Sequence, residues 1–199
     1  MDFATAVENS KSGRRYLKKY NDLQLMPNNL PTANDLDKAE SDEQKAYKRL
    51  ASAVLRLADA KWWASAPKTD QADRVLCELT VMVNEGYRID ILSSPFEEES
   101  IKGKLEWCNN TLPNWLFTKF HIRSDKETFA NSKSILIDDR EKVCKKFSEA
   151  GGCAVLFDEE WLLSLKEVLK NNPITTIYCD LDGVLVDTQS HIAETLKSL

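Results

Sequence analysis

The segment that most constrains the fold is an apolar run near the C-terminus that stops on two carboxylates. Residues 174–179 are rich in β-branched and aromatic side chains, and Asp180, Asp182 and Gly183 follow. Such runs form buried strands, whereas ionised Asp is almost never buried without a partner. Two Asp residues two positions apart project to the same side of an extended backbone, and Gly183 permits a sharp turn. The pattern predicts a strand that ends at a site for Mg²⁺, which prefers oxygen ligands and often shares its shell with phosphate.

Similar apolar runs alternate with helix-length segments over the second half of the chain. Segments with helical spacing also precede them, including one that ends at the Trp62-Trp63 pair. Strands separated by helices imply right-handed crossovers and a parallel sheet. We therefore expect an α/β fold with a doubly wound parallel sheet in residues 67–199, preceded by a small helical cap region in residues 1–66. The expected strands are 87–92, 116–120, 134–137, 153–157 and 174–179.

Three of the expected strands end on polar or acidic residues. These pairs are Ser93 with Ser94, Asp138 with Asp139, and Asp180 with Asp182. In an open parallel sheet, ligands bind beyond the carboxyl ends of the strands. Singly, the serines could cap a strand end and the Asp138-Asp139 pair could cap a helix. Together, the three pairs favour one crevice that holds phosphate and Mg²⁺.

Composition and charge exclude several classes of function. A net charge of −5 argues against broad nucleic-acid binding, which relies on many Lys and Arg. We interpret the basic stretch at residues 11–19 as a solvated helix face, with a nucleic-acid contact as the alternative. Five widely spaced cysteines and two histidines favour neither a disulfide framework nor a zinc site, and indicate a reducing cytoplasm. The chain has no signal peptide and no long apolar stretch, so we expect no membrane partner.

The chemistry-bearing motifs resemble those of the haloacid dehalogenase superfamily. Asp180-Leu-Asp182-Gly183 resembles the first motif, Asp-x-Asp-Gly, and Ser93-Ser94-Pro95 resembles the second. Lys126 resembles the lysine of the third. Asp138-Asp139, with the Gly-Gly and apolar run that follow, is similar to the fourth motif as it occurs in the 5′(3′)-deoxyribonucleotidase family. That family also carries an aromatic pair similar to Trp62-Trp63.

The order of the motifs differs from that of the superfamily. There the first motif opens the catalytic domain, whereas here it nearly closes the chain. The resemblance therefore implies a circular permutation. In it, the strand that ends at Asp180 would lie in the middle of the sheet, between the strands that end at Ser93 and at Asp138.

The resemblance also implies an activity and residue roles. The chain would be a Mg²⁺-dependent phosphomonoesterase that acts on nucleoside monophosphates. Asp180 would form an aspartyl-phosphate, and Asp182 would act as general acid and then as general base. Mg²⁺ would be held by Asp180, the backbone carbonyl of Asp182, and either Asp138 or Asp139. The phosphoryl group would be bound by Ser93, Ser94 and Lys126.

Several residue assignments stay open at this point. Lys119 or Lys133 could replace Lys126, because the segment after Lys126 is longer than in the family. Lys104 fits a surface ion pair as well as a substrate contact. Trp62 and Trp63 could pack in a core or stack on a nucleobase.

The function itself also has alternatives. One is a 3′-phosphatase acting on nucleic-acid ends, for which residues 11–19 are the support. Another is a non-catalytic module that retains the fold. A third is a fragment in which Asp180 opens a further domain. Thr188, finally, stands where the family commonly has an aromatic residue, which affects the expected substrate pocket.

Overall fold

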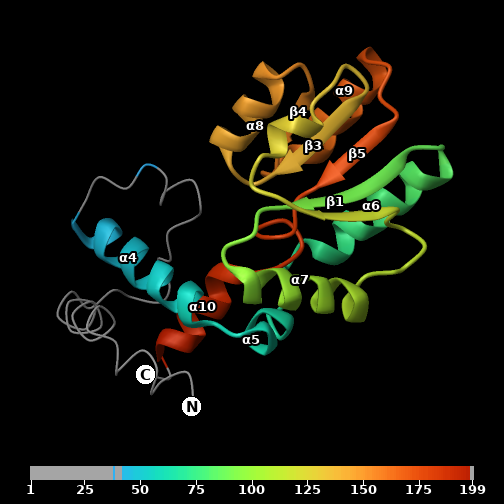
Figure 1. The fold of residues 1–199 in the computed structure, drawn as a ribbon. Coiled ribbons are helices and arrows are strands. Elements are labelled where there is room, and N and C mark those ends of the chain that lie inside the picture. The colour runs from blue at the N-terminus through green and yellow to red at the C-terminus, as the bar shows by residue number, and fades with distance from the viewer. Residues whose placement is uncertain (1–37, 39–41, 198–199) are drawn as a thin grey trace.

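Five parallel strands form one sheet in the computed structural model, which describes residue 38 and residues 42–197 (Figure 1). The strands lie in the order β2-β1-β5-β3-β4. Helices cover both faces of the sheet, which confirms the expected α/β class. The strands are β1 (Arg88–Ser93), β2 (Lys119–Ile122), β3 (Ser134–Asp138), β4 (Cys153–Leu156) and β5 (Thr176–Cys179).

The last strand of the chain occupies the middle of the sheet. Ile177 of β5 lies opposite Ile89 of β1 on one side and opposite Ile135 of β3 on the other. All three side chains are fully buried. The predicted central position of this strand is therefore confirmed, and the carboxyl ends of β1, β5 and β3 lie side by side.

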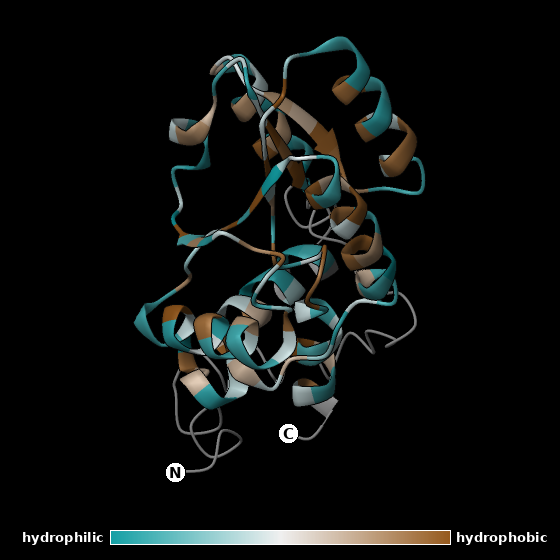
Figure 2. Cartoon of the chain, turned by 90° about the vertical axis from the view of Figure 1, so that its right-hand side faces the viewer, coloured by the Kyte–Doolittle hydropathy of each residue, from teal (hydrophilic) through white to brown (hydrophobic). Residues whose placement is uncertain are grey.

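Helices on the two faces of the sheet bury different parts of the core. The helices described are α4 (Asp42–Leu57), α5 (Ala60–Ala64), α6 (Ala72–Asn84), α7 (Glu98–Thr111), α8 (Glu141–Glu149), α9 (Trp161–Asn171) and α10 (Thr188–Lys197), with a 3₁₀ turn, η2 (Lys126–Phe129). The larger cluster includes buried residues of α6, α7 and α9, among them Leu79, Trp107 and Leu165. On the other face, Phe147 of α8 contacts Leu92 and Leu136. Figure 2 shows largely hydrophobic strands and helices with mixed faces.

Two expected elements differ in detail from the structure. The single helix expected to end at Trp62-Trp63 is broken into α4 and α5, because Asp59 is extended and its side chain accepts a hydrogen bond from the Trp62 backbone (2.8 Å). A carboxylate at this position caps a new helix. Strand β2 begins at Lys119 rather than residue 116, because Leu116 and Phe117 are buried in the core beside α7.

A layer of helices lies beyond the carboxyl end of the sheet (Figure 1). Helices α4 and α10 share a hydrophobic cluster that includes Leu50, Val54 and Ile192. The helical layer therefore contains α10, although the sequence analysis assigned α10 to the sheet region, residues 67–199. Two neighbouring segments connect it to the sheet: the Asp187 N–H donates to the Pro67 carbonyl (2.9 Å), and the Thr69 N–H donates to the Leu185 carbonyl (3.0 Å).

Among residues 38 and 42–197, no helix combines the length and apolar character that crossing a membrane requires. The basic stretch at residues 11–19 lies outside the described residues.

Candidate metal and phosphate site

Three carboxylates meet where the central strands end. Asp180 follows β5, Asp138 ends β3, and Asp139 comes next in the chain. One oxygen from each lies within 4.8 Å of the others. The strand order explains this, since Cys179 and Ile137 are paired neighbours in the sheet. The buried acidic cluster could hold a metal ion, and its all-oxygen donor set fits a hard cation such as Mg²⁺.

Asp138 and Asp139 have different surroundings. Asp138 is fully buried, and its oxygens accept hydrogen bonds from the Arg140 backbone N–H (3.0 Å) and from Lys126 (2.6 Å). Asp139 lines the cavity and faces Gly183, where an added Cβ would overlap the Asp139 carboxylate. Gly183 also has a positive φ of 75°. Only glycine therefore fits both the turn and the close approach of Asp139.

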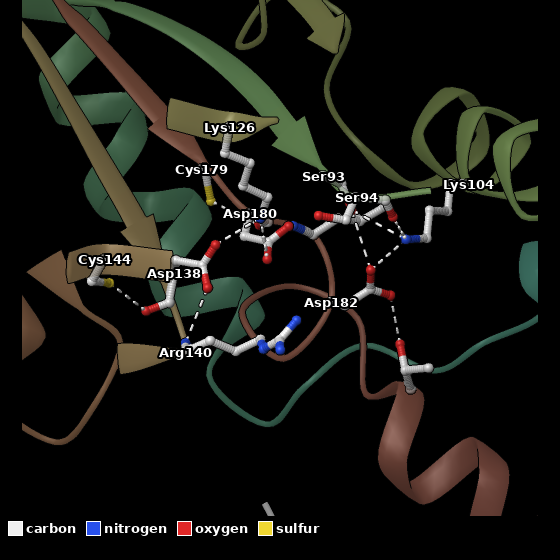
Figure 3. A network of polar contacts seen from close by, with 12 residues as sticks. Ser93, Ser94, Lys104, Lys126, Asp138, Arg140, Cys144, Cys179, Asp180 and Asp182 are labelled. Carbon is white, nitrogen blue, oxygen red and sulfur yellow. Dashed lines mark hydrogen bonds and ion pairs between the residues drawn. The ribbon is translucent and has the colours of Figure 1, made fainter. Parts of the chain in front are cut away.

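Lys126 is the lysine that the fold brings to this cluster. Its Nζ lies 2.6 Å from Asp138 Oδ2 and 2.6 Å from Asp180 Oδ2, and the residue is 3% exposed (Figure 3). Burial acts to lower the pKa of Lys126, but the two carboxylates outweigh it and the pKa is raised. Lys119 and Lys133 are exposed. Of the three lysines that the sequence left open, the site contains Lys126.

The electrostatics of the cluster favour an additional cation. Burial and the charges of Asp180, Asp138 and Asp182 raise the pKa of Asp139 to about 8. Burial also raises the pKa of Asp180 despite its contact with Lys126, with Asp138 and Asp182 adding to the effect. Crowded carboxylates hold protons in this way when too little positive charge is near. A divalent cation would relieve this repulsion.

Asp182 belongs to a second group of contacts, on the side of β1. Its Oδ2 lies 2.5 Å from Lys104 Nζ and 3.2 Å from Ser93 Oγ, and Thr188 Oγ1 donates to its Oδ1 (2.7 Å) (Figure 3). Burial would raise the pKa of Asp182, but Lys104 and these hydrogen bonds outweigh it and hold the pKa below its usual value. Asp182 is therefore held as a carboxylate.

Lys104 is a site residue that sequence reasoning left undecided. It is 3% exposed, and its Nζ also contacts the Ser94 carbonyl (2.5 Å) and Ser93 Oγ (3.2 Å). The surface ion pair considered for Lys104 is therefore wrong, because the ion pair it makes is buried. The available signal was its place on the helix directly after the Ser93-Ser94 strand end. Thr188 is the other site residue that sequence reasoning did not assign, because no spacing in the sequence linked it to Asp182.

The two tryptophans have different positions. Trp63 lines the cavity but is only 4% exposed, and Lys104 Nζ lies 5.2 Å from its ring centroid. The structure does not bring Trp62 to the cavity wall. Its ring lies against His191 at 4.2 Å between centroids, and its Nε1 donates to Thr195 Oγ1 (2.9 Å). Trp62 thus connects α5 to α10.

A cavity of about 330 Å³ lies between the sheet and the helical layer. The carboxylates and lysines of the site line it, namely Asp139, Asp180, Asp182, Lys104 and Lys126. Its other walls come from α4, α8, α10 and the loop after β1, through residues that include Lys48, Ala51, Ser52, Leu55, Ser94, Pro95, Phe96, Arg140, Val143, Gln189 and Ile192. The helical layer therefore forms the wall opposite the carboxylates.

No protein-family model, curated protein or solved structure matches the chain. The likeness to the haloacid dehalogenase motifs consequently stays a prediction from the residues.

Proposed function

We propose that the chain is a Mg²⁺-dependent phosphomonoesterase that hydrolyses nucleoside monophosphates through an aspartyl-phosphate on Asp180. One observation carries the proposal. The Asp180 carboxylate, at the end of the central strand, lines a cavity together with a buried lysine, a neighbouring carboxylate and Asp182. Nucleophile, acid–base group and cations then meet around a single space, as transfer of a phosphoryl group requires.

The proposed metal ligands are Asp180, Asp139 and the backbone carbonyl of Asp182. Asp139 is preferred to Asp138 because Asp139 lines the cavity, whereas Asp138 is fully buried and accepts hydrogen bonds from Lys126 and the Arg140 N–H. Asp138 would instead hold Lys126 in place. When bound, Mg²⁺ would offset the charge of the carboxylates and of the phosphate.

The proposed reaction has two steps. A carboxylate oxygen of Asp180 attacks phosphorus, the bond to the alcohol oxygen breaks, and that oxygen takes a proton from the Asp182 carboxyl group. A water molecule then gives a proton back to Asp182 and attacks phosphorus. The bond to Asp180 breaks, which releases inorganic phosphate and leaves Asp180 as a carboxylate and Asp182 as the protonated carboxyl group that began the cycle.

We expect Lys104 to act in the reaction through its contacts with Asp182 and with the substrate phosphate. Its ammonium contacts Asp182 and the Ser93 hydroxyl, and a substrate phosphate placed between Asp180 and Asp182 would compete for it. As Lys104 moves toward the phosphate, Asp182 loses the contact that keeps it ionised and can take up the proton it must donate. Ser93, Ser94 and Lys126 would complete the phosphate contacts.

The fold supports the proposed circular permutation. Reading the sheet as β2-β1-β5-β3-β4 places the strand before Asp180 between those that end at Ser93 and at Asp138. This is the arrangement that the resemblance to the superfamily implies. A permutation of this kind keeps the site and moves only the chain termini.

Two observations bear on the substrate and the compartment. A volume of about 330 Å³ lies in the usual range for small-molecule pockets and favours a single nucleotide over a nucleic-acid end. The residues that supported a 3′-phosphatase lie outside the described part of the chain. All five cysteines are free thiols, which supports a reducing, cytoplasmic location.

The test is phosphate release from nucleoside monophosphates and other phosphomonoesters, with Mg²⁺ and with excess chelator. We expect Mg²⁺-dependent release that falls at least about 1000-fold in Asp180→Asn, because an amide cannot act as the nucleophile. Asp73→Asn is the matched control, because Asp73 lies on the surface in a pair with Lys68. Release that persists in chelator, or an Asp180→Asn variant within about tenfold of the parent, would contradict the proposal.

A further inference from the structure

The aromatic pair at residues 62 and 63 has little surface to offer a substrate. Trp62 lies against His191 and away from the cavity wall. Trp63 is 4% exposed, with the Lys104 ammonium over its ring and the Trp62 ring against it edge-on at 5.2 Å. The backbone at Trp63 packs closely against Gly103 of α7, where a Cβ would overlap Trp63 Cβ and the Ala60 carbonyl. A ring enclosed in this way cannot stack on a nucleobase without rearrangement.

Among the residues that the structure describes, Phe96 is the exposed aromatic residue that lines the cavity. It is 36% exposed and lines the cavity wall. The other large hydrophobic residues exposed in the described part of the chain, Val81, Trp115 and Leu163, do not line the cavity. Phe96 follows Ser94 by two positions, and both residues line the cavity. A partly exposed aromatic ring in a pocket wall is the usual contact surface for a flat ligand.

The backbone around Phe96 is fixed before any ligand binds. Its N–H donates to Ser100 Oγ (2.8 Å), and the same hydroxyl accepts from the Glu97 N–H (3.1 Å) and donates to the Glu97 carbonyl (2.7 Å). Ser100 is fully buried. The first turn of α7 thus holds Phe96 at a set distance from the strand end. A contact residue held by such supporting hydrogen bonds needs little ordering when a ligand binds.

Apolar side chains from three helices line part of the remaining wall, beside the polar Lys48, Ser52, Arg140 and Gln189. Ala51 and Leu55 come from α4, Ile192 from α10 and Val143 from α8. Together with Phe96 they form an apolar part of the cavity wall, which we call the slot, and the carboxylates and lysines of the site line the same cavity. The leaving group of a substrate bound at Asp180 would extend into this slot.

We propose that Phe96 determines substrate specificity by stacking on the leaving group. The substrates are then phosphomonoesters whose alcohol carries a flat ring, such as a nucleobase, rather than compact polyols. This inference rests on the proposed phosphatase function and deepens it. It also moves the aromatic contact from the Trp62-Trp63 pair to the loop after β1.

The experiment compares two substrates in matched variants. Steady-state kinetics are measured with a nucleoside monophosphate and with glycerol phosphate for the parent, Phe96→Ala and Phe96→Tyr. Phe96→Ala should lower kcat/KM for the nucleotide roughly 5- to 150-fold, mainly through KM, because one stacked base is lost. The value for glycerol phosphate should change less than about twofold, since it has no ring to lose. Phe96→Tyr, which keeps the ring, should stay close to the parent.

Trp115→Ala is the matched control, because Trp115 is 63% exposed and away from the cavity. It should leave both substrates unchanged. Equal losses on the two substrates in Phe96→Ala, or no loss on either, would overturn the role of Phe96 while leaving the phosphatase proposal standing.

A binding measurement separates the two proposals completely. Calorimetric titration of the same nucleotide into the Asp180→Asn protein, with and without Phe96→Ala, reports the contact without turnover. If the parent hydrolyses no phosphomonoester, the phosphatase proposal fails. The Phe96 inference then stands only if Phe96→Ala still weakens nucleotide binding by the expected factor, and otherwise it fails too.

Discussion

The Lys126 ammonium lies 2.6 Å from the Asp180 carboxylate, with only 3% of the lysine exposed. A second carboxylate, Asp138, lies at the same distance on its other side. Burying a lysine is costly unless its charge is matched, and here two acids match it. Lys126 therefore helps to hold the end of the central strand together, and its charge lowers the pKa of Asp180, which burial still keeps above its usual value.

Replacing Lys126 with Met should destabilise the protein and abolish phosphate release. Removing one partner of a buried ion pair costs about 3–5 kcal/mol, because the remaining charges stay buried and unpaired. Urea unfolding measures the loss of stability, and a phosphate assay measures the loss of activity. Lys119→Met and Lys133→Met are matched controls at exposed positions and should change neither property. A Lys126→Met protein as stable as its parent would show that the pair is not a source of stability.

Magnesium should stabilise the protein more strongly as the pH rises from 7 to 8.5. In the metal-free site the pKa of Asp139 is about 8, whereas the pKa of an Asp in the unfolded chain is about 4. The folded state therefore holds the extra proton between these values, so this group's contribution to stability is largest below pH 4 and is lost as the pH approaches 8. Mg²⁺ displaces the proton, and it binds more tightly once the proton is gone.

Unfolding free energies at several pH values, with Mg²⁺ and with chelator, measure this effect. The window above pH 7 avoids His191, whose pKa is lowered by burial, so that its change in stability is complete at lower pH. Asp139→Asn should remove the part of the pH dependence that arises from this carboxylate, leaving the part from Asp180, whose pKa is also raised, and should remove most of the Mg²⁺ effect. A Mg²⁺ stabilisation that is the same at pH 7 and pH 8.5 would be inconsistent with a metal at this carboxylate.

The strand ends could be predicted from sequence because polar or acidic residues directly follow each apolar run. The central position of the strand before Asp180 followed from the motif resemblance, and the pairing of β5 with β1 and β3 confirms it. Lys104 could not be assigned, because its burial depends on how α7 returns across the end of β1. The enclosure of Trp63 likewise depends on the close contact of Gly103 with α5. Such contacts between helices leave no periodic signal in the sequence.

Trp63→Leu should weaken all phosphomonoesters by the same factor, because Trp63 contacts Lys104 rather than the leaving group. A cation–π contact contributes about 0.5–2 kcal/mol, so kcat/KM should fall roughly 2- to 30-fold for nucleotide and glycerol phosphate alike. Trp63→Phe keeps an aromatic face and should recover part of the loss. Kinetics with both substrates provide the measurement. A selective loss on the nucleotide would return the stacking role to Trp63.

Removal of the last strand should leave a protein that does not fold. Without residues 172–199, β1 and β3 each lose their partner in the middle of the sheet and expose unpaired backbone groups. A chain of residues 1–171 should therefore aggregate or lose cooperative unfolding. Circular dichroism, denaturant titration and size-exclusion chromatography measure this directly. A well-folded monomer from residues 1–171 would favour the fragment interpretation instead.

Moving the same residues to the other end of the chain should restore the fold. The variant begins at Asn172, runs to Leu199, and continues through a short Gly/Ser linker into residues 1–171. Because α10 packs against α4, this join does not have to cross the sheet. The sheet order stays the same while Asp180 comes first, as in the superfamily that the motifs resemble. Cooperative unfolding and parent-like phosphate release from this variant would support the permutation. An inactive variant that folds cooperatively would mean that the site needs the native covalent connection between α9 and β5, and the proposed permutation would fail.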